Sequence, residues 1–244
     1  MIGIPNIGNT CFINSLLQCL FNDDKFRKYI LSNKFKYKNR KYDTIFVALK
    51  KIFIQLYEQD EVRDELEVFC KELQVLGKED IIAENISNFN IHNDASELLV
   101  YLLDILNDHS QLNYETPIKN KSEKIFFKNI KNKSIVSNLF KIQQLKQLQC
   151  QSCSNLYPLN FNNNINIWQL NISQHFINSL FDAIKYDSMT KIINSYNCEK
   201  CKETVEVKER TILSILPPTL IIQLLRFENN GSKITKNILI PFII

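Results

Sequence analysis

Two Cys-x-x-Cys pairs constrain the fold of this 244-residue chain more than any other feature of its sequence. Cys150 and Cys153 form the first pair, Cys198 and Cys201 form the second, and 44 residues lie between the two pairs. Four thiolates in this spacing can surround a zinc ion as a tetrahedron, with Zn–S distances of about 2.3 Å. The interval is longer than in a bare zinc ribbon, so the intervening chain must leave the site and return as an inserted subdomain. Because four cysteines leave no open position, the predicted zinc is structural and does not activate water.

The cellular compartment bears on the choice between zinc ligation and disulfide formation. Residues 1–20 are interrupted by Asn6, Asn9, Asn14 and Gln18 and carry no basic segment, so they match neither a secretory signal nor a membrane span. We therefore expect a protein of the cytosol or the nucleus, without membrane association, where thiols stay reduced. Disulfides and chance spacing are the alternatives for the four cysteines, and a reducing compartment favours metal. A composition with 45% hydrophobic and 23% charged residues is typical of an ordinary soluble globular protein.

Hydrophobic periodicity changes along the chain from helical to strand-like. Apolar residues recur at helical spacing in four stretches of the first half: Cys11–Phe21, Ile45–Leu56, Leu66–Leu73 and Asp94–Leu106. Stretches rich in Lys or Asn predict loops or inserted segments at Lys119–Ser134 and Asn160–Asn166. Strand-like alternation follows at Ile165–Ile172, Val205–Arg210, Leu220–Phe227 and Ile234–Phe242. Helices followed by strands predict an α+β fold.

Cys11 is the candidate nucleophile. A thiol reacts as its anion, and the start of a helix favours an anion through free N–H groups and the positive end of the helix dipole. Gly8 allows a bound substrate chain to approach the backbone closely, and Asn6 could aim its amide at the oxygen of an acyl intermediate. The alternative for a cysteine at a helix start is a small buried apolar residue. That same role in the core is what we predict for Cys19 and Cys70, which stand among apolar residues.

The stretch from Gly3 to Gln18, GIPNIGNTCFINSLLQ, resembles the cysteine box of ubiquitin-specific proteases almost position by position. The resemblance implies that Cys11 attacks the carbonyl of ubiquitin's C-terminal glycine and that Asn6 helps to stabilise the oxyanion. Phe12 stands where the family usually has Tyr, so the ring is kept and the hydroxyl is lost. Further residues match the box, and we expect them to hold the helix and the preceding loop together: Asn14, Ser15 and Gln18.

The segment HNDASELL, residues 92–99, is similar to the family's Gln-x-Asp-x-x-Glu-Phe-Leu motif. The resemblance implies that Asp94 faces the basic tail of ubiquitin. The alternative role for Asp94 is a helix cap paired with Glu97, and the two roles are compatible. His92 replaces the family's Gln and is a candidate for binding the same tail, because a ring nitrogen can imitate an amide.

Two more landmarks extend the resemblance over nearly the whole chain. LPPTLIIQLLRF, residues 216–227, resembles a family strand, and the two cysteine pairs resemble the family's zinc-bearing fingers. The resemblance implies a papain-like α+β fold and a single catalytic domain over residues 1–244, incomplete at its C-terminus. Within it we expect a helical thumb over residues 1–110, a zinc-bearing fingers region over 140–215 and palm strands over 216–244.

A thiol hydrolase also needs a base, normally a histidine oriented by Asp or Asn. In the family this histidine follows the last strands in a Gly-rich segment, and none of His92, His109 and His175 matches that position. We expect surface or capping roles for His109 and His175. Three explanations compete: a truncated protease, which the stop inside a strand pattern favours; a natural ubiquitin binder without activity; or a base supplied by another chain.

The sequence thus predicts a monomeric deubiquitinating thiol hydrolase that acts on ubiquitin or ubiquitinated proteins, with an inactive ubiquitin-binding pseudo-protease as the alternative. Glu58–Glu84 contains ten acidic and three basic residues, and this stretch is either a solvated helical face or a docking surface for the basic surface of ubiquitin. A zinc-ribbon scaffold or nucleic-acid-binding protein is the least favoured class. Its basic run, Lys119 to Lys133, carries few aromatic residues and is better explained as a solvated loop.

Overall fold

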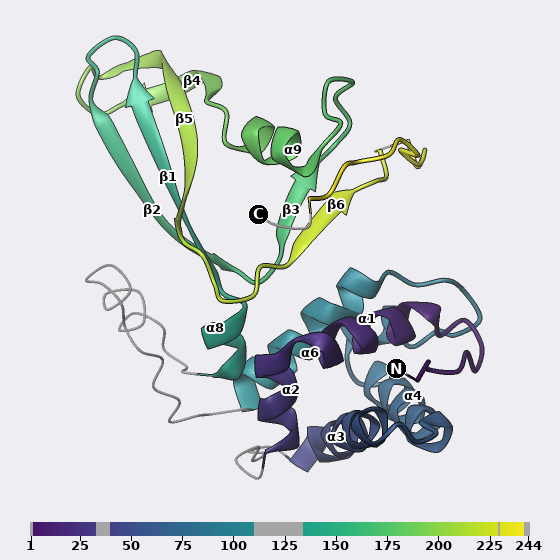
Figure 1. Cartoon of the computed structure of the whole chain (residues 1–244). Helices are drawn as coiled ribbons and strands as arrows, with labels where there is room; N and C mark the ends of the chain where they lie inside the picture. The colour runs from purple at the N-terminus through teal and green to yellow at the C-terminus, as the bar shows by residue number, and fades with distance from the viewer. Residues whose placement is uncertain (1, 33–39, 110–133, 229, 242–244) are drawn as a thin grey trace. The chain divides into compact units, whose positions relative to one another are not determined.

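The computed structural model describes residues 2–32, 40–109, 134–228 and 230–241. They belong to two units, Met1–Leu139 and Phe140–Ile244, each with its own interior. Figure 1 shows helices in the first unit and mainly strands in the second. Helices followed by strands is the order that the sequence predicts, and the α+β class is confirmed. The finer division into thumb, fingers and palm stays a prediction.

Amphipathic sequences form the helices of the first unit. The predicted helices are present as α1 (Cys11–Asn22), α3 (Asp43–Glu58), α4 (Arg63–Gly77) and α6 (Ala95–His109). Shorter segments that the periodicity does not reveal are α2 (Asp24–Leu31), the 3-10 turn η1 (Arg40–Tyr42), α5 (Ile81–Ile86) and α8 (Ile135–Leu139). These segments span at most 8 residues, which is too short for an apolar repeat to be told from chance.

Aromatic side chains fill much of the interior of the first unit. Phe53 on α3 is fully buried and meets Phe21 of α1 and Phe26 of α2 edge-on, with ring centroids 5.5 and 6.1 Å away. Edge-on ring pairs add to the hydrophobic contribution of burial itself. The Phe53 ring on α3 therefore packs against both α1 and α2.

The second unit contains a four-stranded antiparallel sheet in the order β2-β1-β5-β4. Its strands are β1 (Ile142–Cys150), β2 (Leu156–Ile165), β4 (Lys191–Cys198) and β5 (Glu203–Ile215). A parallel pair consists of β3 (Trp168–Asn171) and β6 (Ile222–Leu225). Because β1 and β4 both run antiparallel to β5, they point the same way. Cys150 ends β1 and Cys198 ends β4, so the sheet brings one cysteine of each pair to the same end.

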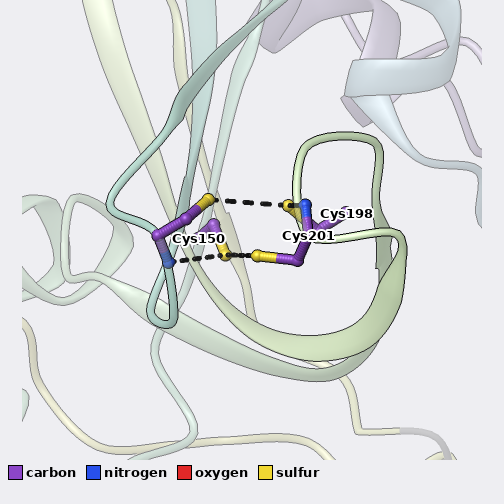
Figure 2. Close-up of side chains that lie close together, drawn as sticks. Cys150, Cys198 and Cys201 are labelled. Atoms are coloured by element: carbon purple, nitrogen blue, oxygen red, sulfur yellow. Dashed lines mark hydrogen bonds between the residues drawn. The ribbon is translucent and has the colours of Figure 1, made fainter.

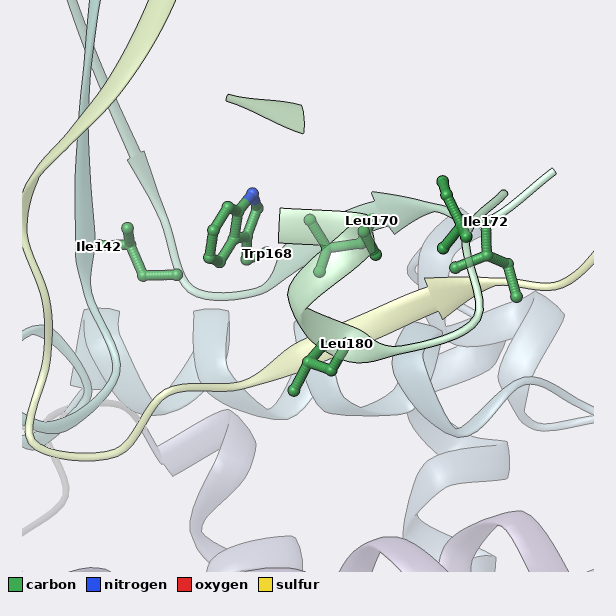
Figure 3. Close-up of a cluster of buried hydrophobic side chains, with 7 residues drawn as sticks. Ile142, Trp168, Leu170, Ile172 and Leu180 are labelled. Carbon is green, nitrogen blue, oxygen red and sulfur yellow. The ribbon is translucent and has the colours of Figure 1, made fainter. Parts of the chain in front are cut away.

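Helix α9 (Leu180–Asp187) covers the parallel strand pair and closes a second core (Figure 3). A capping box starts it: the Ser179 hydroxyl accepts from the Asp182 N–H, and the Asp182 carboxylate accepts from the Ser179 N–H. The Asp182 carboxylate accepts several hydrogen bonds, and these lower its pKa, with the largest effect from the Ser179 hydroxyl. Trp168 lies in this core and its indole N–H donates to Asp187 Oδ2 at 2.9 Å. The buried residues around it are Ile142, Leu170, Ile172, Ile177, Leu180 and Ala183.

The asparagine tract is not a loop, so that prediction is wrong. Residues 160–165 complete β2; Asn163, Asn164 and Ile165 pair with β1 in a register that sets Ile142 opposite Ile165, and the register shifts between Asn163 and Leu159. Ladder hydrogen bonds involve only the backbone, so a polar tract can pair beside an established strand. The predicted strand Ile165–Ile172 is in turn divided, because Ile165 ends β2 whereas Trp168 begins β3 in the other sheet.

The strand predicted at Ile234–Phe242 does not form within the described residues, which end at 241. Leu239 makes only an isolated bridge to Ser179. Upstream, the backbone carbonyls of Ile234 and Lys236 both accept hydrogen bonds from the Arg226 guanidinium, at 3.2 and 3.1 Å. The Ile234 N–H in turn donates to the Arg226 carbonyl oxygen at 2.7 Å, so the start of this segment is bound to Arg226 and does not continue as a ladder.

Two of the predicted strands form, and one predicted loop lies almost wholly outside the described residues. The strands expected at Val205–Arg210 and Leu220–Phe227 are confirmed as β5 and β6. The loop expected at Lys119–Ser134 lies outside the described residues except for Ser134, which is buried. Among the described residues, no helix combines the length and apolar character needed to cross a bilayer.

Truncation of Phe53, whose ring on α3 contacts α1 and α2, should destabilise the first unit strongly. We expect Phe53→Ala to lower the free energy of unfolding by about 3–5 kcal/mol, because it removes a buried ring and leaves a cavity. Urea titration followed by the helical far-UV circular dichroism signal measures the loss. The fluorescence of Trp168, the single tryptophan, reports the second unit in the same samples.

Tyr57→Ala is the matched control, because Tyr57 lies on the same helix with 67% of its surface exposed. It should change the stability by no more than about 0.5 kcal/mol. Equal losses in the two variants would contradict the packing described for α3.

Candidate functional site

Cys11 is the first residue of α1, and its side chain is exposed. The next two residues, Phe12 and Ile13, are buried on the opposite side of the helix. This exposure excludes the alternative of a small buried apolar role for Cys11. Exposed positions recur every four residues along α1, at Cys11, Ser15 and Cys19. The prediction that Cys19 lies in the core is therefore wrong, because eight residues of helix return it to the face of Cys11; Cys70, in contrast, is buried as predicted.

Side-chain amides of α1 hold the segment that precedes it. Asn14 Nδ2 donates to the carbonyl oxygens of Ile4 and Pro5, at 3.3 and 2.9 Å, and Gln18 Nε2 donates to the carbonyl oxygen of Ile2 at 3.1 Å. This segment has no regular secondary structure, so its carbonyls depend on such partners. The expected role of Asn14 and Gln18 thus has a physical basis. Ser15 differs: its hydroxyl donates to the Cys11 carbonyl within the helix.

A clasp between Asn6 and Thr10 shapes the turn before Cys11. Asn6 Oδ1 accepts from the backbone N–H of Thr10 at 3.2 Å and from its hydroxyl at 3.0 Å, and the same hydroxyl accepts from the Ile7 N–H. Because the oxygen end of the Asn6 amide is engaged, its NH₂ end is the part left to donate. Thr10 precedes α1 without making a side-chain cap hydrogen bond. Its role in orienting Asn6 was missed from the sequence.

Gly8 lies in this turn with φ +140°, a backbone conformation that side-chain-bearing residues rarely adopt. An added Cβ at Gly8 would meet no atom within 4 Å. The exposed surface at this point is compatible with the close approach of a substrate chain that the sequence suggests. The positive φ of Gly8 is a second reason for glycine at this position, because the turn requires a backbone conformation that other residues rarely adopt.

The two predicted sequence motifs of the first unit are linked to each other. Asn9 Nδ2 donates to the carbonyl oxygen of Phe89 at 2.9 Å, and the Phe12 ring lies 6.5 Å from the Phe89 ring. Phe89 belongs to the segment that leads into α6, where Asp94 and His92 are both exposed. The turn before Cys11 and the segment before α6 therefore support each other.

Asp94 caps helix α6. Its Oδ1 accepts from the backbone N–H and the hydroxyl of Ser96, at 2.7 and 2.8 Å. The cap predicted for Asp94 is thus present, but Ser96 is its partner where the sequence suggested Glu97. One carboxylate oxygen orients the helix start, and the exposed side chain can also face a ligand.

The histidine side chains that the structure describes are those of His92 and His175. His92 and His175 are exposed, and His175 stacks edge-on against Phe176 in the second unit, with ring centroids 5.5 Å apart. His109 is the last residue of α6, and its side chain lies outside what the structure describes. Within the described residues, no imidazole is hydrogen-bonded to the Cys11 thiol.

The four cysteines of the two Cys-x-x-Cys pairs come together in the second unit (Figure 2). Their sulfurs all lie within 4.8 Å of one another, with 3.8 Å between Cys150 and Cys201 and 3.8 Å between Cys153 and Cys198. A tetrahedron with Zn–S distances of about 2.3 Å has sulfurs about 3.8 Å apart. The donor set and its dimensions therefore fit a tetrahedral metal ion.

The two cysteine turns repeat the same backbone geometry. The N–H of Cys153 donates to Cys150 Sγ at 3.5 Å, and the N–H of Cys201 donates to Cys198 Sγ at 3.3 Å. Left-handed residues follow each turn, Ser154 at φ 58° and Lys202 at φ 61°. Each turn therefore presents two sulfurs and points backbone N–H groups at one of them, the arrangement that a thiolate ligand favours.

Hydrogen bonds shift the pKa values of Cys150, Cys198 and Cys201 in different directions. A hydrogen bond from the Tyr157 hydroxyl, together with the Cys201 N–H, lowers the pKa of Cys198 to about 6. The N–H of Cys153 lowers the pKa of Cys150, whereas neighbouring sulfurs raise the pKa of Cys201. Four negative charges at this spacing repel one another, so a cation is needed for all four to ionise together. Tyr157 was missed from the sequence, where a tyrosine near a cysteine pair gives no distinctive signal.

Comparisons with known proteins find related sequences and structures. The family model described as ubiquitin carboxyl-terminal hydrolase matches residues 2–244. The probable ubiquitin carboxyl-terminal hydrolase 16 of Schizosaccharomyces pombe is 25% identical, over 98% of this chain and 50% of the relative. Human ubiquitin carboxyl-terminal hydrolase 26 is 27% identical, over 93% of this chain and 25% of the relative. The chain thus spans half or less of the length of these relatives.

Solved structures share the fold. The Ubp8/Sgf11/Sus1/Sgf73 DUB module of SAGA bound to ubiquitin aldehyde contains a chain that matches 99% of this one with a TM-score of 0.73, at 20% identity. A related module bound to monoubiquitin matches with a TM-score of 0.75, also at 20% identity. The match covers 51 and 52% of those chains. The fold predicted from the resemblance is confirmed.

A methyl group at Gly8 should strain the turn before Cys11. We expect Gly8→Ala to lower the free energy of unfolding by about 1–2 kcal/mol, because alanine resists the positive φ although the space around it is open. Gly3→Ala is the control, since Gly3 is also exposed and an added Cβ there would also meet no atom within 4 Å, but Gly3 lacks a positive φ. It should be neutral or slightly stabilising. Urea denaturation of both variants measures the difference, and equal effects would show that φ at Gly8 is not constraining.

Proposed function

Because the chain belongs to the ubiquitin carboxyl-terminal hydrolase family, we propose that it carries the nucleophile of a deubiquitinating thiol hydrolase. In this proposal Cys11 attacks the carbonyl carbon of ubiquitin's C-terminal glycine and forms a thioester. The exposure of Cys11 at the first residue of α1 is the observation that carries the proposal. A helix start supports an anionic sulfur, and exposure gives a protein substrate access to it.

Asn6 and Gly8 have roles in the same proposal. The Thr10 clasp engages the oxygen of the Asn6 amide, so its NH₂ group can donate to the oxyanion that forms when Cys11 attacks. Gly8 leaves the substrate's extended, glycine-ended tail free to pass close to the backbone. Asp94 and His92, exposed on the segment that Asn9 links to this turn, are proposed to bind the basic part of the tail.

The leaving amine must take a proton when the bond to the glycine carbonyl breaks. A histidine normally supplies that proton and pairs with the thiol. The second candidate function, kept from the sequence analysis, is a ubiquitin-binding protein that does not turn over substrate. The two candidates share the binding surface and differ only in whether Cys11 reacts.

The four-cysteine cluster is proposed to hold zinc in a structural role. Cys150, Cys153, Cys198 and Cys201 would occupy every position of the tetrahedron, so the metal would fasten the end of β1 to the end of β4. When bound, zinc supplies charge neutralisation and cross-linking. The cluster and Cys11 belong to different units of the chain.

The acidic stretch Glu58–Glu84 is proposed as a docking surface for basic residues of ubiquitin. Part of its charge is used internally, since Glu65 pairs with Lys51 at 2.9 Å and Glu79 pairs with Lys41 at 3.0 Å. Glu58, Asp60, Glu61 and Asp64 are exposed where α3 gives way to α4. Glu61 lies 3.8 Å from Arg63, so Glu58, Asp60 and Asp64 are the exposed charges of this connection that we propose to steer a basic partner.

A ubiquitin probe with an electrophile in place of its terminal carboxylate tests the proposed function. We expect the probe to form a covalent bond with Cys11, detected by mass spectrometry of the peptides. Cys11→Ser should abolish the adduct. Cys19→Ser should leave it unchanged, because Cys19 offers a second exposed thiol two turns further along the same face.

The same assay separates the two candidate functions. Binding of unmodified ubiquitin without labelling of Cys11 would support the inactive binder and contradict the hydrolase. A folded chain that neither binds ubiquitin nor reacts with the probe would contradict both. Labelling that survives Cys11→Ser would show that another group is the nucleophile.

A further inference from the structure

The hydroxyl of Tyr157, near the start of β2, reaches a cysteine of the opposite edge strand of the sheet. Its oxygen lies 3.1 Å from Cys198 Sγ, at the end of β4. The backbone N–H of Lys200 donates to the same tyrosine oxygen at 3.2 Å. Tyr157 therefore touches both a cysteine and the backbone of the turn that carries it.

The direction of these hydrogen bonds follows from their partners. The tyrosine oxygen accepts from Lys200, which leaves its own proton to be donated. A sulfur that ligates a metal is a thiolate and has no proton, so in the loaded site only Tyr157 can be the donor of the pair. The contact is then an O–H···S⁻ hydrogen bond to a buried, charged acceptor.

This hydrogen bond makes the four sulfurs unequal. Cys150 and Cys198 each accept a backbone N–H from the cysteine three residues later. Within the described part of the chain, Cys198 is the one of these two that also accepts a hydrogen bond from a side-chain hydroxyl, that of Tyr157. A zinc ion with four thiolates carries a net charge of about −2, and each hydrogen bond to sulfur disperses part of that charge.

We propose that Tyr157 is a positioning residue for the metal ligand Cys198, and that its hydroxyl increases the affinity of the four-cysteine site for zinc. The inference rests on the structural zinc site proposed above. Outer hydrogen bonds of this kind fix the orientation of a ligand and stabilise its ionised form, and their loss typically weakens metal binding 10- to 100-fold, as a rough guide.

Tyr157→Phe tests the proposal, because it removes the hydroxyl and keeps the ring. We expect the Kd for zinc, measured on the whole chain by competition with a chromophoric chelator, to rise roughly 10- to 100-fold. In the cobalt-substituted protein the sulfur-to-cobalt charge-transfer band should move to longer wavelength, because a thiolate that loses a hydrogen bond gives up its electron more easily.

Tyr196→Phe is the matched control. The Tyr196 ring lies 5.7 Å from the Tyr157 ring and packs against the same cluster, but within the described structure its hydroxyl makes no bond to sulfur. It should leave both the zinc Kd and the cobalt spectrum unchanged. Equal zinc affinity and equal spectra for Tyr157→Phe and the wild type would overturn the proposal while leaving the zinc site itself intact.

Thermal unfolding and zinc content test two other ways in which the proposal can fail. Thermal unfolding after metal removal distinguishes a purely structural role: if Tyr157→Phe lowers Tm as much in the chelated protein as in the loaded one, the hydroxyl does not act through the metal and the proposal fails.

The zinc content of the wild type and of Cys198→Ser tests the zinc site on which the role of Tyr157 rests. A wild type that binds no zinc, or a Cys198→Ser chain that binds it equally well, would overturn both the zinc site and the role of Tyr157.

Discussion

The hydrogen bonds from Asn14 and Gln18 to the carbonyls of Ile2, Ile4 and Pro5 are the interaction on which the candidate site depends. The segment before α1 has no ladder or helix of its own to satisfy its backbone. Side chains from successive turns of α1 supply donors, and the segment therefore follows the helix closely. Cys11 comes to lie exposed at the point where this segment turns into α1, above a face of the helix that is packed into the core.

The second unit depends on a different constraint, because the end of its sheet that carries the cysteines has little apolar material. Its buried cluster consists of Leu148, Val205 and Val207 together with Cys150 and Cys198, with Tyr157, Ile193 and Tyr196 packed against it and only partly buried. A core this small provides limited hydrophobic stabilisation, which scales with the buried apolar area. Cross-linking of two strand ends through four sulfurs can supply what packing does not, as structural metal sites do in other small domains. Cys150 and Cys198 thus belong to this core, and in the proposed zinc site they would also be ligands, oriented by the hydrogen bonds to their sulfurs.

The sequence predicted those features that depend on local pattern. The long helices were found because their apolar residues recur at helical spacing, and the four-cysteine cluster because two short turns fix the spacing of each sulfur pair. Tertiary context decided the rest. Cys19 has apolar neighbours in sequence, yet helical geometry returns it to the exposed face of Cys11. The asparagine tract resembles a loop by composition, but the presence of β1 beside it gives its backbone a partner. The Asn6–Thr10 clasp and the contact of Tyr157 with Cys198 join residues that no periodic pattern connects.

A crystal structure of the chain after reaction with ubiquitin aldehyde tests the central claim most directly. The account predicts a thiohemiacetal on Cys11 Sγ whose oxygen lies within about 2.7–3.2 Å of Asn6 Nδ2, while Asn6 Oδ1 keeps its hydrogen bonds to Thr10 and residues 2–5 stay bound to α1. A bond to a different residue, or an Asn6 amide that faces away from the thiohemiacetal oxygen with the Thr10 clasp intact, would contradict it.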